Sequence, residues 1–121
     1  MGAPTRRPPS EDRQAIIHKF SVGGITGHIT AGMYPDGTVC EIYIQMAKMG
    51  SALQGLLDSF SIAFSLALQY GVPLKELTER LKGTRYEPNG FTNNPEIPIS
   101  KSISDYLARW LEDHFLQKKL E

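Results

Sequence analysis

The spacing of apolar residues changes once along the chain, and this change constrains the fold more than any other feature. Between Ala15 and Ala47 apolar and polar residues alternate, a pattern typical of strands with one wet face. Gly23-Gly24 and Pro35-Asp36-Gly37 interrupt the alternation with residues that favour tight turns. We therefore expect a meander of three strands, over residues 15–22, 25–33 and 39–47.

After residue 50 the apolar residues recur at three- and four-residue steps, which predicts helices. Ser51 and Gln54 fit a capping box at the start of the first helix, and Gly71 can close it. Its apolar stripe, which includes Leu56, Leu57 and Phe64, favours a buried core helix lying across the sheet.

Two further helices follow. A short amphipathic one begins at Pro73 and ends at Gly83. The last begins at Ser100 or Ser102 and has a pair, Asp105 with Arg109, that we expect on its outer side.

Strands that come first and helices that come afterwards indicate the α+β class. We predict a three-stranded antiparallel meander followed by three helices packed on one face, in the order βββαα-loop-α. Residues 1–14, rich in proline and charge, are expected to form a disordered arm or linker. Residues 15–118 then form a single domain, and residues 119–121 a tail or a vector-derived remnant.

Length and composition exclude several classes of protein. The chain has 121 residues, the size of one domain, and its 13 Lys and Arg balance 13 Asp and Glu. A general nucleic-acid binder normally carries a positive surplus, so no nucleic-acid partner is expected. No signal peptide and no membrane-spanning stretch are expected either. A lone cysteine, Cys40, cannot build a disulfide framework and favours a reducing, cytoplasmic setting.

Few residues carry recognisable chemistry. His18 and His28 lie on neighbouring predicted strands, but nothing in their spacing sets a metal site, and no metal is expected. Cys40 lies on an apolar strand face, where a thiol behaves as a small hydrophobe. Asp58 could be a buried acid or a partner in a buried ion pair, but a solvent-side position is favoured.

The loop over residues 84–98 is the most suggestive surface element. It holds three prolines yet also aromatic residues and Ile97, which indicates that it is pinned. A fork-shaped donor, two aromatics and a rigid turn are the composition of an interface anchor. The candidate binding residues are Arg85, Tyr86, Glu87, Asn89 and Phe91. The alternative, a loop packed on its own domain through Tyr86 and Phe91, has equal weight.

From the residues alone, the chain is best interpreted as a small interaction or regulatory module. A stand-alone enzyme is the weaker alternative. A concave site with two or more convergent ionisable groups would favour the enzyme.

Several stretches, in order along nearly the whole chain after residue 11, resemble the C-terminal region of the adenosylcobalamin-dependent (class II) ribonucleotide reductases. The region is similar to the one called the TSCPD domain, although the five-residue motif that names it is absent. The matching stretches are residues 12–20, 45–51, 57–60, 67–74, 85–95 and 108–111.

The resemblance implies a reaction that this chain cannot perform alone. Enzymes of that family make deoxyribonucleotides, for DNA replication, with a thiyl radical and a cysteine pair in a ten-stranded barrel. A chain of 121 residues with one cysteine lacks the barrel and the thiols. No catalytic or cobalamin-binding residue of the family maps onto it, so the resemblance places adenosylcobalamin in the parent enzyme only.

The functional expectation is therefore a non-catalytic module of a vitamin B12-dependent ribonucleoside-diphosphate reductase. It would dock on the catalytic barrel, in the same or a separate chain, or position the redox tail, with the loop as its leading contact. The alternative is a free-standing regulatory or nucleotide-sensing domain.

Overall fold

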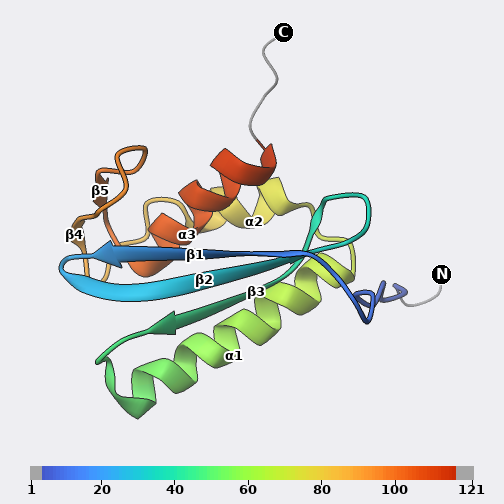
Figure 1. The fold of residues 1–121 in the computed structure, drawn as a ribbon, viewed down its shortest axis with the longest axis horizontal. Coiled ribbons are helices and arrows are strands. Elements are labelled where there is room, and N and C mark those ends of the chain that lie inside the picture. Colours follow the sequence, from blue (N-terminus) through green and yellow to red (C-terminus); the bar gives the residue numbers. More distant parts are fainter. Residues whose placement is uncertain (1–3, 117–121) are drawn as a thin grey trace, which may run out of the picture. The chain divides into compact units, whose positions relative to one another are not determined.

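Three antiparallel strands come first and helices follow, as the change in apolar spacing predicts. The structure is a computed structural model that describes residues 4–116. Its elements are β1 (Ala15–Val22), β2 (Ile25–Met33), β3 (Val39–Met46), α1 (Gly50–Gln69), α2 (Leu74–Leu81), β4 (Gly90–Phe91), β5 (Ile99–Ser100), α3 (Ile103–Leu111) and the π-helical turn η1 (Glu112–Leu116) (Figure 1). The α+β class is confirmed, while packing of all three helices on one face stays a prediction. The predicted tail at 119–121 lies outside the described residues.

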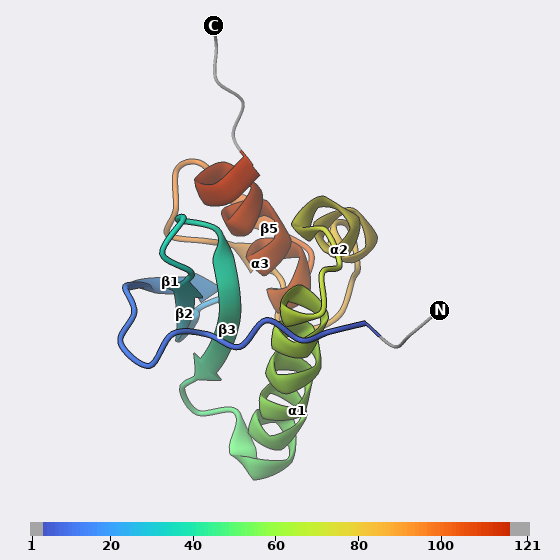
Figure 2. The same ribbon diagram turned by 90° about the vertical axis from the view of Figure 1, so that its right-hand side faces the viewer.

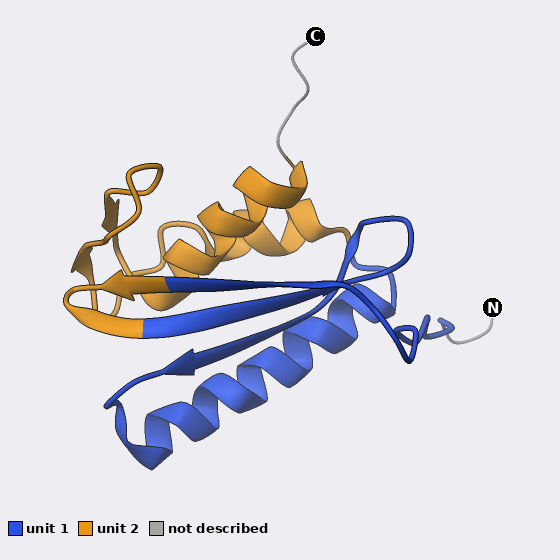
Figure 3. Cartoon of the chain, viewed as in Figure 1, with its two compact units in different colours: residues 1–19, 27–72 blue, residues 20–26, 73–121 orange. Residues whose placement is uncertain are grey.

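The chain divides into two compact units, coloured separately in Figure 3. Unit 1 comprises residues 1–19 and 27–72, and unit 2 comprises residues 20–26 and 73–121. The three long strands form one sheet in the order β1-β2-β3, and β4 and β5 form a separate pair. The sequence predicts one domain over 15–118, and that boundary stays a prediction.

In unit 1, β2 and β3 pair antiparallel from Gly27 opposite Met46 to Met33 opposite Val39. The turn between them uses Gly37 at φ +89°, a conformation that glycine adopts without strain. Burial alternates as predicted over residues 27–31 of β2 and 42–46 of β3, whereas residues 39–42 are all buried. The buried apolar side chains of the unit are those of Ile29, Ala31, Tyr34, Val39, Cys40, Ile42, Ile44, Met46, Leu57 and Phe64.

Helix α1 runs beside the edge strand β3 and hydrogen-bonds to its backbone (Figure 2). Ser65 Oγ accepts from the Ile42 N–H at 3.0 Å and donates to the Ile42 carbonyl at 3.2 Å. One turn further on, the Gln69 amide donates to the Cys40 carbonyl at 2.9 Å. Near the start of the helix, Gln54 accepts from the Met46 N–H and donates to the Ile44 carbonyl, at 3.0 and 3.1 Å. Polar side chains of the helix thus satisfy the outward groups of an edge strand.

The two ends of α1 give different outcomes for the sequence predictions. The helix begins at Gly50 after Met49, which gives no side-chain cap, so the capping box of Ser51 with Gln54 is wrong. The Gln54 side chain instead hydrogen-bonds to the backbone of β3. At the other end Gly71, at φ +97°, closes the helix as predicted, with Gly71 and Val72 N–H groups bonded to the Leu68 and Ala67 carbonyls.

The apolar stripe of α1 is only partly buried. Leu57 and Phe64 are buried, but Leu56 is exposed, while Ser65 and Gln69 are buried. The helix is also long and apolar enough to cross a membrane by length and composition alone, which corrects the expectation that no segment qualifies. Of its most apolar window, 28% is buried within the structure.

Residues 4–14, the described part of the segment before β1, contain no helix or strand, but specific contacts hold them against the rest of unit 1. Arg6 Nε donates to Gln69 Oε1 at 2.7 Å, and the Arg7 guanidinium lies over the Tyr34 ring, 3.7 Å from its centroid. Arg13 forms a two-pronged ion pair with Glu41. These contacts place Arg6, Arg7 and Arg13 against unit 1, and the disordered arm or linker over residues 1–14 stays a prediction.

Unit 2 is organised around the carboxylate of Asp105. Its Oδ1 accepts from the Gly83 N–H at 2.8 Å, and its Oδ2 from the Lys101 N–H at 2.9 Å. Ser100 Oγ and Arg109 Nη1 also donate to Oδ2. The predicted pair with Arg109 is confirmed, but its outer position is wrong, because Asp105 is buried.

The capping of the helices in unit 2 follows the sequence. Ser102 caps α3 through its side chain, which accepts from the Asp105 N–H at 2.9 Å. Gly83, at φ +84°, follows the end of α2 as predicted. The Phe20 and Tyr106 rings stack with centroids 4.6 Å apart. The buried apolar side chains of this unit are those of Phe20, Val22, Ile97, Ile103, Tyr106, Leu107, Ala108, Trp110 and Leu111.

The hydrogen bonds between α1 and β3 can be tested with two serines on the same helix. Ser65→Ala removes both partners of Ile42 and should lower the free energy of unfolding by about 1–3 kcal/mol. Ser61 is equally buried, but its Oγ has no hydrogen-bond partner among the described residues. Ser61→Ala should therefore be neutral or stabilising. Urea denaturation of both variants measures the contrast, and equal effects would refute the role of Ser65.

Asp105 should make the stability of the chain depend on pH. Burial alone would raise the pKa of this carboxyl, but the N–H groups of Lys101 and Gly83, with Arg109 and Ser100, hold the pKa below its ordinary value of 3.8. A lowered folded-state pKa stabilises the fold above the ordinary value. That stability is lost as the pH falls through the folded-state pKa.

Asp105→Asn should lower the unfolding free energy at neutral pH by about 3 kcal/mol and reduce its fall in acid. Denaturation curves between neutral and acidic pH measure both effects. Asp12→Asn, at an exposed carboxylate, is the matched control and should change little. An unchanged acid response in Asp105→Asn would contradict the assignment.

Candidate docking loop

The loop that the sequence singles out lies in unit 2 between α2 and α3, and its first half is anchored at Tyr86. The Tyr86 N–H donates to the Lys101 carbonyl at 3.1 Å, and its hydroxyl lies 2.7 Å from Ser104 Oγ. That hydroxyl also accepts from the Ser104 N–H at 3.0 Å. The peptide bond between Glu87 and Pro88 is cis. Tyr86 thus joins the loop to the start of α3.

The second half of the loop extends the end of β1. The Gly23 N–H donates to the Phe91 carbonyl at 2.9 Å, Val22 pairs with Thr92 in a β-bridge, and Ser21 N–H donates to Asn93 Oδ1 at 3.0 Å. A side chain at Gly23 would place a Cβ 2.4 Å from the Asn89 carbonyl oxygen, so the close approach requires glycine. The prediction that the loop is pinned is confirmed.

The pinned backbone leaves an apolar pair on the surface. Phe91 stands opposite Ile99 in the β4–β5 pair, and the two side chains are 76% and 53% exposed. Cross-strand neighbours of this kind lie close enough to form one contact surface. The alternative in which Phe91 packs on its own domain is therefore wrong, while Tyr86 remains 37% exposed beside its hydrogen bonds.

The other candidate residues flank this pair along the chain. Arg85 and Glu87 are exposed, and Asn89 is half-buried and donates to the Tyr86 carbonyl at 3.4 Å. Sequence reasoning missed Ile99. In an extended segment Ile99 would lie on the same side as Ile97, which is buried, so the spacing alone gave no sign that Ile99 is exposed.

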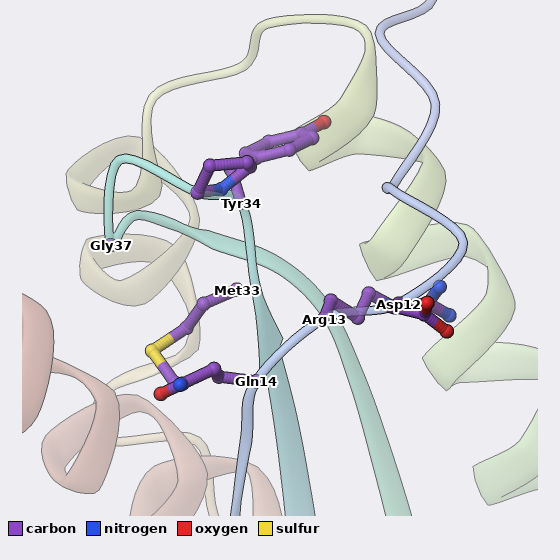
Figure 4. A pocket seen from close by; sticks show the side chains of 7 residues that line it. Asp12, Arg13, Gln14, Met33, Tyr34 and Gly37 are labelled. Atoms are coloured by element: carbon purple, nitrogen blue, oxygen red, sulfur yellow. The ribbon is translucent and has the colours of Figure 1, made fainter.

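Unit 1 has a pocket of about 410 Å³ beside the arm. Residues 12–14 and 33–37 contribute to its lining, and Figure 4 shows the side chains of Gln14 and Met33 approaching one another. Arg13 is committed to Glu41, whose hydrogen bond raises the pKa of the guanidinium further. Gly32 makes room for this pair, because a Cβ there would lie 2.3 Å from Glu41 Oε2. Arg13 therefore holds the arm through its ion pair with Glu41, and its charge is not directed at a ligand in the pocket.

The remaining chemical candidates are dispersed. His18 is half-buried, and His28 and His114 are exposed. Within residues 4–116, no group of three or more His, Cys, Asp or Glu side chains is placed to hold a metal ion. Cys40 is fully buried, and this burial raises the pKa of its thiol. Asp58 is on the solvent side, as favoured, and accepts from Gln54 Nε2 at 2.8 Å.

Comparison with known proteins gives consistent relatives. A vitamin B12-dependent ribonucleotide reductase of Rhodopirellula baltica is 47% identical over 93% of this chain, which corresponds to 11% of that protein. Proteins of the same name from Streptantibioticus cattleyicolor and Agrobacterium fabrum are 42% and 41% identical over 93% and 86% of the chain, or 19% and 8% of their own lengths. No solved structure matches.

The chain thus spans about a tenth to a fifth of the length of most of these relatives, so it corresponds to one small part of each. The family description "TSCPD domain" matches residues 4–115, which include the loop at 84–98 and most of both units. The predicted resemblance is confirmed, and the chain belongs to the TSCPD domain family.

Proposed function

We propose that this chain is a non-catalytic module of a vitamin B12-dependent ribonucleotide reductase of class II, a cytoplasmic enzyme that supplies deoxyribonucleotides for DNA replication. The module docks on the catalytic barrel or positions the redox tail. The proposal is supported by identity over 93% of the chain to proteins that are far longer. The barrel belongs to the same polypeptide or to a separate one.

The observation that carries the proposal is the exposed Phe91–Ile99 pair on a rigid base. Apolar side chains that are fixed before binding lose little conformational entropy when a partner covers them. Tyr86, Thr92 and Gly23 hold the backbone on both sides of the pair. Aromatic anchors flanked by an arginine are the residue types that dominate binding energy at interfaces.

The residues of this chain do not fit the chemistry of the cofactor. Adenosylcobalamin in the parent enzyme would serve to start a thiyl radical, which needs an accessible thiol. Cys40 is fully buried on β3, and its pKa is raised. We derive no step through the cofactor and assign its binding to the parent enzyme.

The docking role can be tested by mixing the chain with a reductase from which the matching segment has been deleted, and measuring binding by calorimetry together with turnover. Phe91→Ser should weaken binding about tenfold, because an anchor is lost, and Arg85→Ala should weaken it less. Lys75→Ala, at an exposed position on α2, is the control. Absence of binding by the unmodified chain, or equal binding by all variants, would refute the proposal.

A further inference from the structure

We propose that the outer face of α1 is a second docking surface, which packs against an apolar surface of the remaining part of the reductase chain. The outer face comprises Leu56, Ile62 and Leu66, the capping residue Tyr70 directly after the helix, and the exposed small residues Ala52, Gly55, Ser59 and Ala63. It lies wholly in unit 1, whereas the docking loop lies in unit 2. The inference rests on the proposed function and names a different surface for it.

The distribution of side chains around α1 departs from that on an ordinary surface helix, although Leu57 and Phe64 are buried. Polar side chains normally face solvent and apolar ones the core. Here Gln54, Ser65 and Gln69 turn inward to β3. The four large apolar residues of the outer face are between 41% and 67% exposed.

The outer face is also nearly free of charge. Asp58 is the single ionisable residue in the 20 residues of α1. Neighbouring apolar residues on one side of a long helix form a contiguous surface, which marks an interaction site more often than a free one. Only an uncharged, apolar partner surface suits it, because a buried unpaired charge would be costly.

Gly55 gives a second, independent observation. A glycine inside a helix lowers its stability relative to almost any other residue. A Cβ at Gly55 would meet no atom within 4 Å, so the packing of this chain does not require glycine. A backbone without side chain in the first third of α1 lets another chain approach the outer face closely.

The length of the relatives indicates which partner covers the outer face. The matching segment is 11% of the Rhodopirellula baltica reductase, so about nine tenths of that chain lie outside the described structure. A surface in the same polypeptide is present at high effective concentration. It therefore covers the outer face before a second copy or a lipid surface does.

The test titrates the chain into the reductase that lacks the matching segment. Gly55→Leu should raise the melting temperature of the free chain, since leucine is the better helix former, yet weaken binding at least about tenfold. Leu66→Glu should weaken binding to a similar degree. Ile17→Glu, at an apolar β1 residue that is 71% exposed, is the matched control and should bind like the unmodified chain.

Each outcome of the titration supports or overturns the assignment of the outer face. If the unmodified chain does not bind, the proposed function and this inference both fail. If it binds and Phe91→Ser weakens binding while Gly55→Leu and Leu66→Glu do not, this inference alone fails. Self-association in sedimentation experiments, or binding to vesicles of neutral phospholipid, that Leu66→Glu abolishes would assign the outer face to a second copy or to a membrane, and would overturn the inference.

Discussion

The hydrogen bonds from α1 to β3 determine how the rest of unit 1 is arranged. An edge strand presents a row of N–H and carbonyl groups that would otherwise pair with another chain. Gln54, Ser65 and Gln69 occupy that row between Cys40 and Met46, and their side chains replace a fourth strand. Because polar residues of the helix occupy part of its inner side, several large apolar residues, Leu56, Ile62 and Leu66, lie on its exposed side.

A buried carboxylate plays the corresponding part in unit 2. Asp105 accepts from Lys101 and Arg109, which are close in sequence, and from Gly83 after α2, so one carboxylate joins the end of α2 to the start of α3. These hydrogen bonds hold the two ends of the loop at 84–98. Tyr86 and the bridge at Thr92 complete the support, and the backbone that carries Phe91 is held at both ends.

Local patterns predicted the elements well, because their causes are local. Alternation predicted the three strands, Gly71 and Gly83 were correctly placed at helix ends, and Ser102 caps α3. The face of α1 could not be predicted in this way. Leu56 and Leu57 both fit helical spacing, and only the position of β3 decides that Leu57 is buried and Leu56 exposed.

The same limit explains the errors about polar residues. Gln54 three residues after Ser51 fits a capping box, but a glutamine side chain can equally reach an unpaired strand. Asp105 four residues before Arg109 fits a surface pair, and nothing in that spacing reveals the N–H groups of Gly83 and Lys101. In the loop, sequence composition identified Phe91 but not its partner Ile99, since their pairing depends on the register of β4 and β5.

Several charged side chains are paired with one another within the chain, and this affects how the chain can associate with a partner. Arg13 is paired with Glu41, Arg109 with Asp105 and Lys82 with Glu112, and the formal net charge is +0. Without an excess of charge, long-range steering contributes little to the association rate. Affinity must then come from apolar contacts, which act only at short range. A covalent link to the partner supplies the encounter that charge does not, and this favours a module that works as a segment of a longer chain over one that must find its partner by diffusion.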